Sequence, residues 1–263
     1  MGLYNNRIVV KVGTSTLTND AGKSDLRTTD RLACVLSDIQ NMGYEVVLVS
    51  SGAIAVGRNK LNMTAKPDSM RMKQAAAAVG QCSLMYLYDK FFGDYDKTVA
   101  QILLNADDIE EEEKKENLIN TFNALLEMGV IPIVNENDSV SYKEIESEDR
   151  LFGDNDMLSA VVAVLCRAKH LVIFSDIDGF YDPRLYPNAQ LIDQIDTIDD
   201  SVYALAGGAG SRRGTGGMRT KLQAASLATS QGTNTIVTNG KRPEVLYDII
   251  KGGKAGTLFP GKI

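Results

Sequence analysis

Short apolar runs that alternate with helical patterns constrain the fold of this chain more than any other feature. The runs are rich in β-branched residues and lack strict polar–apolar alternation, which indicates strands buried on both faces of a sheet. They occupy residues 8–12, 45–49, 130–134, 171–174 and 235–238. Pro132 donates no hydrogen bond to a strand ladder, so we expect it at a strand start or on an unpaired flank.

Helical patterns separate these strands. They cover residues 30–42, 70–92, 118–126, 156–166 and 220–230. Strands and helices in alternation predict an α/β fold, with a mainly parallel central sheet sandwiched by helices and joined by right-handed crossovers. The chain shows no internal repeat and no long linker, so we expect residues 1–263 to form a single domain.

Acidic residues outnumber basic ones, 34 against 28, and the net charge is −6. Such a chain has no general electrostatic surface for nucleic acid or for an anionic membrane. The longest purely apolar run, residues 160–166, is far shorter than the roughly 20 residues of a membrane-spanning helix. Cys34, Cys82 and Cys166 are widely spaced, which predicts buried reduced thiols rather than disulfides. We therefore expect a cytoplasmic protein.

Small and polar residues follow four of the predicted strands, at the edge where an open parallel sheet binds its ligands. These segments are residues 11–15, 50–53, 135–138 and 175–179, and a glycine-rich segment, 214–221, opens a further helix. Glycine lets a backbone N–H approach an anion closely, and a helix N-terminus adds its dipole. No segment completes a P-loop or a G-x-G-x-x-G fingerprint. The pattern indicates binding of more than one phosphate or carboxylate group.

Two lysines are candidate phosphate ligands. Lys11 lies in an apolar strand, where burial of an unpaired ammonium costs several kcal/mol. It either reaches past the strand end to a phosphate or extends its stem to the surface. Lys221 lies at the first turn of a helix, where a cation opposes the helix dipole unless an anion is present. Asp138 and Asp176, each after a strand, either bind or orient a cation or cap a turn.

The residues that are missing also restrict the chemistry. His170 is the only histidine, and neither a Ser-His-Asp set nor a cluster of His and Cys metal ligands can be assembled. A reaction that needs a general base near neutral pH is therefore poorly served. Phosphoryl transfer to a carboxylate needs no base, because the acceptor is already ionised at pH 7. It needs positioning and cations.

Six motifs, in this order along the chain, resemble the amino acid kinase family, and within it the members that phosphorylate glutamate. They occupy residues 10–15, 50–57, 134–138, 152–156, 175–181 and 214–221. The resemblance implies the three-layer α/β/α amino acid kinase fold. It also implies transfer of the γ-phosphoryl group of MgATP to the side-chain carboxylate of L-glutamate. The product would be L-glutamyl 5-phosphate, the first step of proline biosynthesis, and L-proline would inhibit the reaction.

The resemblance implies a role for individual residues as well. Lys11 and Lys221 would neutralise the transferred group, and Asp176 would organise the two lysines. L-Glutamate would be held by Ser51, Gly52, Asp138 and Asn155. ATP would be held by Lys11, Gly13, Ser175, Asp176, Thr215, Gly216, Gly217, Met218, Arg219, Thr220 and Lys221. Mg²⁺ would be carried by ATP, without direct side-chain ligands.

The chain departs from the family pattern in two ways. Residues 139–151 look a few residues longer than in some relatives, and they are a candidate mobile lid because they join two glutamate-binding motifs. Many relatives also continue into a C-terminal PUA domain, which we do not expect in this chain. Relatives associate as dimers or tetramers, so we expect a homo-oligomer, and contact with glutamyl phosphate reductase is a further candidate.

Two alternatives to a glutamate kinase stay open. One is another kinase of the same fold that acts on a small carboxylate such as N-acetylglutamate. The other is a regulatory protein that binds glutamate or proline without turnover. The presence of Lys11, Lys221 and Asp176 favours turnover, because a sensor needs no groups on the transferred phosphate.

Overall fold

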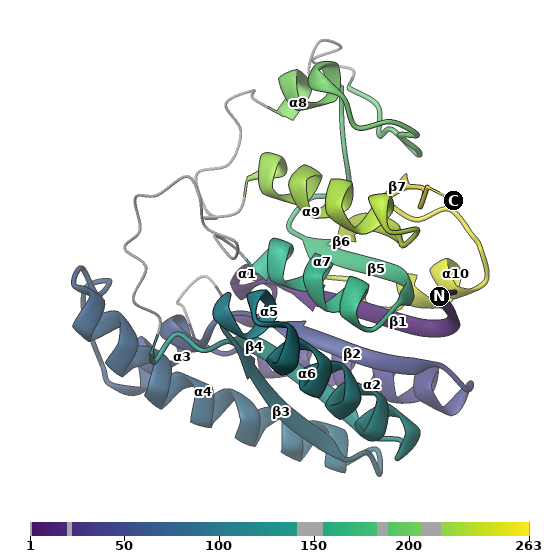
Figure 1. The fold of residues 1–263 in the computed structure, drawn as a ribbon. Helices are drawn as coiled ribbons and strands as arrows, with labels where there is room; N and C mark the ends of the chain where they lie inside the picture. The colour runs from purple at the N-terminus through teal and green to yellow at the C-terminus, as the bar shows by residue number, and fades with distance from the viewer. Residues whose placement is uncertain (1, 20–22, 141–154, 183–188, 207–216, 263) are drawn as a thin grey trace.

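A mostly parallel sheet forms the centre of the molecule (Figure 1). The computed structural model describes residues 2–19, 23–140, 155–182, 189–206 and 217–262, and within them seven strands stand in the order β3-β4-β2-β1-β5-β6-β7. Neighbouring strands are parallel except β6 and β7. The strands are β1 (Tyr4–Val12), β2 (Glu45–Ser50), β3 (Val99–Leu104), β4 (Ile131–Glu136), β5 (Ala168–Ser175), β6 (Asn234–Asn239) and β7 (Thr257–Phe259).

Helices cover both faces of this sheet, as Figure 1 shows. On one face α1, α2, α3, α4 and α10 bury residues such as Leu36 and Phe92, and on the other α6, α7 and α9 bury residues such as Phe122 and Leu158. The helices are α1 (Thr14–Leu17), α2 (Leu26–Asn41), α3 (Ala53–Lys60), α4 (Met70–Gly93), α5 (Asp107–Glu110), α6 (Glu112–Glu127), α7 (Asn155–Leu165), α8 (Asp200–Ala206), α9 (Met218–Ser230) and α10 (Val245–Ile250). The predicted α/β sandwich is confirmed.

Strand β1 lies between β2 and β5, where the chain changes its direction of travel across the sheet. The connections after β1 and β2 lead away to one side of β1, through α2 and then α3 and α4. The connections after β4 and β5 lead to the other side, through α7 and then α8 and α9. In open parallel sheets such a change of direction leaves a crevice at the carboxyl ends of the strands, where ligands bind. We therefore expect a ligand-binding site at the carboxyl end of β1.

All five predicted strands and all five predicted helices are present, with bounds that shift by a few residues. Pro132 is the second residue of β4 and precedes the ladder that β4 shares with β2, which confirms its expected place. The edge strands β3 and β7 were not predicted. Strand β3 is only partly buried and β7 has three residues, so neither carries the continuous apolar signal of a central strand.

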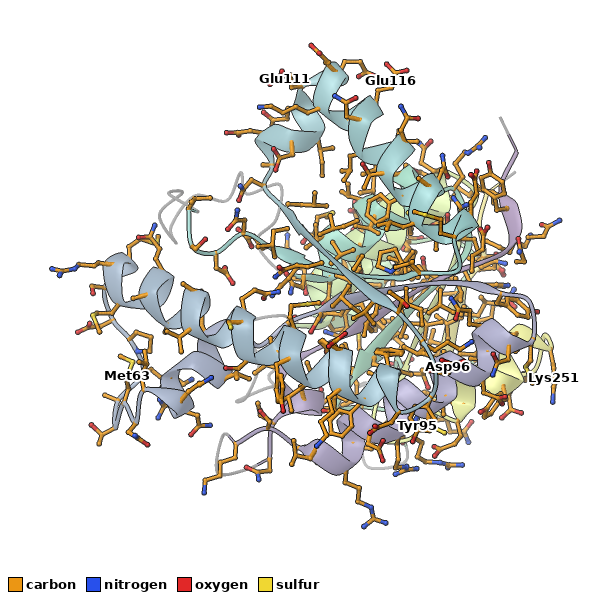
Figure 2. All side chains as sticks on the ribbon, turned by 90° about the horizontal axis from the view of Figure 1, so that it is seen from below. Met63, Tyr95, Asp96, Glu111, Glu116 and Lys251 are labelled. Carbon is orange, nitrogen blue, oxygen red and sulfur yellow. The ribbon has the colours of Figure 1, made fainter. Side chains whose placement is uncertain are left out.

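The mostly acidic residues 107–113 lie on the surface, where they form α5 and the start of α6. Lys114 pairs with Glu111, and Figure 2 shows Glu111 at the outer tip of this segment. Cys166 is buried as predicted, but Cys34 and Cys82 are exposed, so the prediction of burial is wrong for these two. Within the described residues, every helix is too short or too polar to cross a membrane.

Candidate active site

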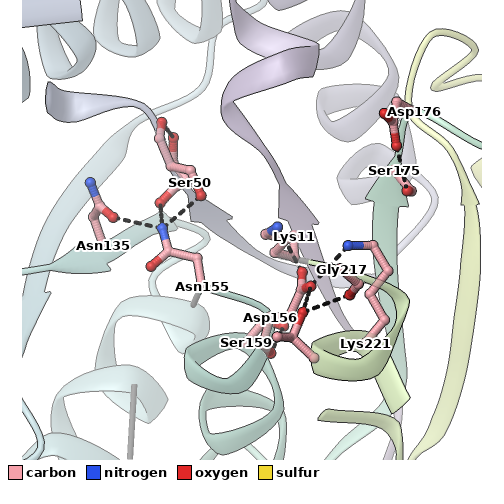
Figure 3. A network of polar contacts seen from close by, with 12 residues as sticks. Lys11, Ser50, Asn135, Asn155, Asp156, Ser159, Ser175, Asp176, Gly217 and Lys221 are labelled. Atoms are coloured by element: carbon pink, nitrogen blue, oxygen red, sulfur yellow. Dashed lines mark hydrogen bonds and ion pairs between the residues drawn. The ribbon is translucent and has the colours of Figure 1, made fainter. Parts of the chain in front are cut away.

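Two lysines from distant parts of the chain meet on one carboxylate (Figure 3). The Nζ atom of Lys11 lies 2.7 Å from Oδ1 of Asp156, and the Nζ atom of Lys221 lies 3.0 Å from Oδ2 of the same residue. All three residues are buried, with exposed fractions of 5 % for Lys11, 0 % for Asp156 and 7 % for Lys221. The hydroxyl of Thr220 donates a further hydrogen bond of 3.0 Å to Oδ2. We call Lys11, Asp156 and Lys221 the charged triad.

The fold brings the charged triad together through three elements. In β1 successive side chains alternate between the two faces of the sheet, so Lys11 shares a face with Val9, which packs in the core beneath α7 and α9. Asp156 is in the first turn of α7, and Lys221 is in the first turn of α9. Because α7 and α9 pack side by side on this face, their first turns meet over the carboxyl end of β1 (Figure 1).

The charged triad carries one net positive charge. Burial of the Asp156 carboxyl by itself would raise its pKa, but Lys11 and Lys221 outweigh this effect and hold the pKa below its ordinary value of 3.8. The carboxylate is therefore ionised near neutral pH, and it balances only one of the two ammonium groups. Two ammonium groups gathered on one carboxylate favour the approach of an anion. The charged triad is therefore suited to hold a phosphoryl group.

The carboxylate between the two lysines belongs to Asp156, whereas the resemblance had assigned that organising position to Asp176. Asp176 directly follows β5 and accepts a 3.2 Å hydrogen bond from the Ser175 hydroxyl. Its role toward a nucleotide stays a prediction. The sequence held a signal for Asp156, because a single carboxylate opens a helix that is otherwise almost entirely apolar. A charge in that position calls for a buried cation as its partner.

On one side of the charged triad, polar groups from the ends of two strands, β2 and β4, gather around Asn155 at the start of α7 (Figure 3). The Nδ2 atom of Asn155 donates to the Ser51 hydroxyl at 2.7 Å, to the Ser50 carbonyl at 2.7 Å and to Oδ1 of Asn135 at 3.0 Å. Gly52 follows Ser51 with a φ of +97°, a left-handed conformation that favours glycine, and it begins α3 as its N-cap. Ser51 and Asn155, two residues that are predicted to bind L-glutamate, are thus in direct contact.

Asp138, which is also predicted to bind L-glutamate, lies in the turn after β4. This turn leaves the same edge of the sheet as the Ser51 segment, because β2 and β4 are parallel neighbours. The proposed lid, residues 139–151, lies almost wholly outside the described residues.

The predicted nucleotide residues lie on the other side of the charged triad. Ser175 and Asp176 stand at the end of β5, and Gly217 is the N-cap of α9, followed by Met218, Arg219, Thr220 and Lys221. The N-cap Gly217 has no side chain with which to cap this helix start, and a Cβ there would meet no described atom within 4 Å. The Thr220 N–H donates a 3.2 Å hydrogen bond to the Gly217 carbonyl, and a helix start of this kind can bind an anion through its other first-turn amides. Thr215 and Gly216 lie outside the described residues.

Gly13 completes the nucleotide side. It is the N-cap of the short helix α1, directly after β1, and the site of a Cβ on it would lie 3.5 Å from Nζ of Lys11. A Cβ at this position would be in ordinary van der Waals contact with the ammonium group. Among the described residues, no three or more His, Cys, Asp or Glu side chains gather in a way that could hold a metal ion.

The sequence of the chain was compared with those of known proteins. Residues 6–239 match the profile of the Amino acid kinase family. The chain therefore belongs to the amino acid kinase family. It is 55% identical over 258 residues to glutamate 5-kinase of Clostridium perfringens, which covers 97% of this chain and 96% of the relative. It is 48% identical over 255 residues to glutamate 5-kinase of Enterococcus faecalis, which covers 96% of this chain and 94% of that relative.

Solved structures resemble the fold at low sequence identity. Carbamate kinase from Giardia lamblia bound to AMP-PNP has a TM-score of 0.67 at 16% identity, covering 98% of both chains. UMP kinase from Bacillus anthracis has a TM-score of 0.64 at 14% identity, covering 98% of this chain and 97% of that chain. These likenesses establish the fold that the six motifs implied.

Proposed function

We propose that this protein is an ATP-dependent kinase that phosphorylates the side-chain carboxylate of L-glutamate. The observation that carries the proposal is the charged triad, in which Lys11 and Lys221 converge on one buried carboxylate with a net positive charge. Two anionic reactants must approach each other in this reaction, and buried cations lower the cost of that approach. The glutamate 5-kinases to which the chain is similar support L-glutamate as the acceptor.

The chemistry follows from the groups at the carboxyl edge. An oxygen of the glutamate side-chain carboxylate forms a bond to the γ-phosphorus of ATP, while the bond from that phosphorus to its bridging oxygen breaks and ADP leaves. No base is needed, because the attacking carboxylate is ionised at neutral pH. Lys11 and Lys221 neutralise charge on the transferred group. Asp156 holds both ammonium groups in place, so their position costs no rearrangement during the reaction.

The two reactants occupy opposite sides of the charged triad in this proposal. Ser51, Gly52, Asp138 and Asn155 hold L-glutamate, with Asp138 as the partner of its ammonium group and the Gly52 turn as a donor to its carboxylate. The first turn of α9, the Gly13 turn and the end of β5 hold ATP, together with Thr215 and Gly216. Mg²⁺ bound to the ATP phosphates supplies further positive charge. Asp176 serves the nucleotide as a contact at the end of β5.

A substrate comparison tests the proposal. The protein is incubated with ATP, magnesium and hydroxylamine, which converts an acyl phosphate to a coloured hydroxamate. L-Glutamate, N-acetyl-L-glutamate and L-aspartate are compared as acceptors. We expect signal with L-glutamate alone. Signal with N-acetylglutamate would overturn the substrate assignment, and glutamate binding without any hydroxamate would favour a protein that senses glutamate without turnover.

The resemblance supports further proposals about the setting of this reaction. We propose that the protein acts in the cytoplasm at the first step of proline biosynthesis, as a single domain that assembles into a dimer or tetramer. L-Proline inhibits it, and glutamyl phosphate reductase takes up its unstable acyl phosphate. Initial rates with increasing L-proline, and light scattering of the purified protein, test the inhibition and the assembly.

A further inference from the structure

A chain of side-chain amides leads from α4 into the proposed glutamate site. The Oε1 atom of Gln81, on α4, accepts a 2.9 Å hydrogen bond from Nδ2 of Asn135. Oδ1 of Asn135 accepts from Nδ2 of Asn155 at 3.0 Å and from the backbone N–H of Glu136 at 2.9 Å. Gln81 was not singled out by the sequence, and among these contacts it touches Asn135 rather than Ser51 or Asn155. Its effect on the site must therefore act through Asn135.

The amide chain fixes which way each side chain faces. An amide group has one acceptor end and one donor end, so a partner at one end decides the orientation of the other. Because Gln81 accepts from Nδ2 of Asn135, Oδ1 of Asn135 faces Asn155. That contact holds Nδ2 of Asn155 together with the Ser51 hydroxyl and the Ser50 carbonyl. The opposite end of the Asn155 amide, its carbonyl oxygen, is then directed away from these partners.

Helix α4 is a firm support for this chain. It crosses α3 at a contact so close that a Cβ at Gly80 would lie 1.7 Å from the Ala53 carbonyl oxygen, and a Cβ at Gly57 would lie 1.7 Å from that of Ala76. Further along α4, the buried Tyr88 hydroxyl is 2.8 Å from the Ser50 hydroxyl. Burial raises the pKa of Tyr88, so its hydroxyl stays protonated as a hydrogen-bonding partner. The helix is thus tied to the Ser50–Gly52 segment from two directions.

We propose that Gln81 is a positioning residue for L-glutamate, which acts by orienting Asn135 and through it Asn155. The inference rests on the proposed function, because it takes the Asn155 cluster as the glutamate site. Gln81 does not contact the nucleotide side, since Ser175 and Asp176 belong to β5 and the loop after it, on the far side of the charged triad (Figure 3). Its removal should therefore change the affinity for one substrate only.

Steady-state kinetics of the Gln81→Met variant test the proposal, since methionine fills similar space without a comparable acceptor. We expect the KM for L-glutamate to rise about tenfold, the fold-change for a lost hydrogen bond of typical strength. The KM for ATP and the kcat should stay within about twofold of wild type. The matched control is Gln40→Met, which also removes a glutamine hydrogen bond, to the Gly129 carbonyl at the end of α6, and should leave both KM values unchanged.

A double-mutant cycle separates positioning from general loosening. In an Asn135→Ala background, Gln81→Met should raise the KM for L-glutamate by less than about twofold, because the residue through which it acts is gone. Asn135→Ala alone, which removes both ends of this link, should give the same selective rise in the KM for L-glutamate. It serves if Gln81→Met fails to fold.

Three outcomes overturn the inference. They are an unchanged KM for L-glutamate in Gln81→Met, an equal rise in both KM values, and full additivity with Asn135→Ala. The wild-type protein is assayed first. If it forms no hydroxamate with L-glutamate, the proposed function is overturned instead. An active wild type with an unaffected Gln81→Met variant overturns the positioning role alone.

Discussion

At the scale of single residues, the charged triad serves the proposed reaction but lowers the stability of the folded protein. Lys11, Asp156 and Lys221 are buried together, and one carboxylate cannot neutralise two ammonium groups. Holding two ammonium groups close together in advance has some cost to the folded state, as is common where binding groups are preorganised.

Lys221→Met should separate the two effects. We expect the kcat for glutamyl hydroxamate formation to fall at least about 100-fold, because one charge on the transferred group is lost. The free energy of unfolding should stay within about 1 kcal/mol of wild type or rise, because a neutral Lys11–Asp156 pair remains. Enzyme assays and urea unfolding measure both quantities. Lys254→Met, which removes an exposed ion pair with Asp193, is the control for loss of a lysine; near-normal turnover of Lys221→Met would exclude Lys221 from the transfer.

His170 should make the stability depend on pH. Burial, aided by the neighbouring Lys169, lowers its pKa from 6.5 to about 4 in the folded protein. Between these values the unfolded chain binds a proton that the folded protein does not, so the free energy of unfolding falls as the pH drops from 6.5 toward 4. In His170→Gln the fall in the free energy of unfolding between pH 6.5 and 4 should be smaller by about 3 kcal/mol. Urea unfolding at several pH values measures the difference, and parallel curves for the two proteins would contradict it.

At the scale of elements, the contact between α3 and α4 has almost no space to spare. Gly57 and Gly80 allow the two backbones to touch, and any side chain at either position would overlap a carbonyl of the opposite helix. This contact positions the turn before α3, which holds Ser51 and Gly52, relative to Gln81 on α4.

Gly80→Ala should therefore lower the free energy of unfolding by about 3 kcal/mol, because the helices must move apart. Gly93→Ala, at the last residue of the same helix, meets no described atom within 4 Å and should cost nothing. Urea unfolding of the two variants gives the comparison. Equal stability of the pair would mean that the close crossing does not hold α3 and α4 together.

The elements also show what the sequence could and could not predict. Central strands such as β1 and β5 are covered on both faces, so their apolar runs identify them, while β3 at the edge is only partly covered and gives a weak signal. Lys11 and Lys221 were found because a cation is out of place in an apolar strand and in a first helical turn. Asp156 was not chosen as their partner. Its place at the start of an apolar helix indicates a buried charge, but the packing of α7 on α9 decides which cations it meets.

At the scale of the whole molecule, the order of the strands places the two proposed substrate sites on opposite sides of β1. Strands β2 and β4 end at the residues that we propose bind L-glutamate. The end of β5 and the start of α9 carry the residues that we propose bind ATP. The charged triad takes one residue from β1 and two from helices that follow, so it stands at the boundary.

This division predicts that substrate affinities change separately. Asp138→Asn should raise the KM for L-glutamate about tenfold or more and leave the KM for ATP within about twofold, because it removes a charge only from the glutamate side. Initial rates with each substrate varied in turn provide the measurement. An unchanged KM for L-glutamate would dismiss Asp138 as the ammonium partner, and a matching rise for ATP would contradict the division itself.

The central claim is that Asp156 holds Lys11 and Lys221 together at the point of phosphoryl transfer, and the kcat of Asp156→Asn tests it most directly. Asparagine keeps the shape of the side chain but removes the charge that both ammonium groups share. We predict that the variant, shown to be folded by circular dichroism, forms glutamyl hydroxamate at least about 100-fold more slowly than wild type at saturating ATP and L-glutamate. A folded variant whose kcat stays within a few-fold of wild type would contradict the account.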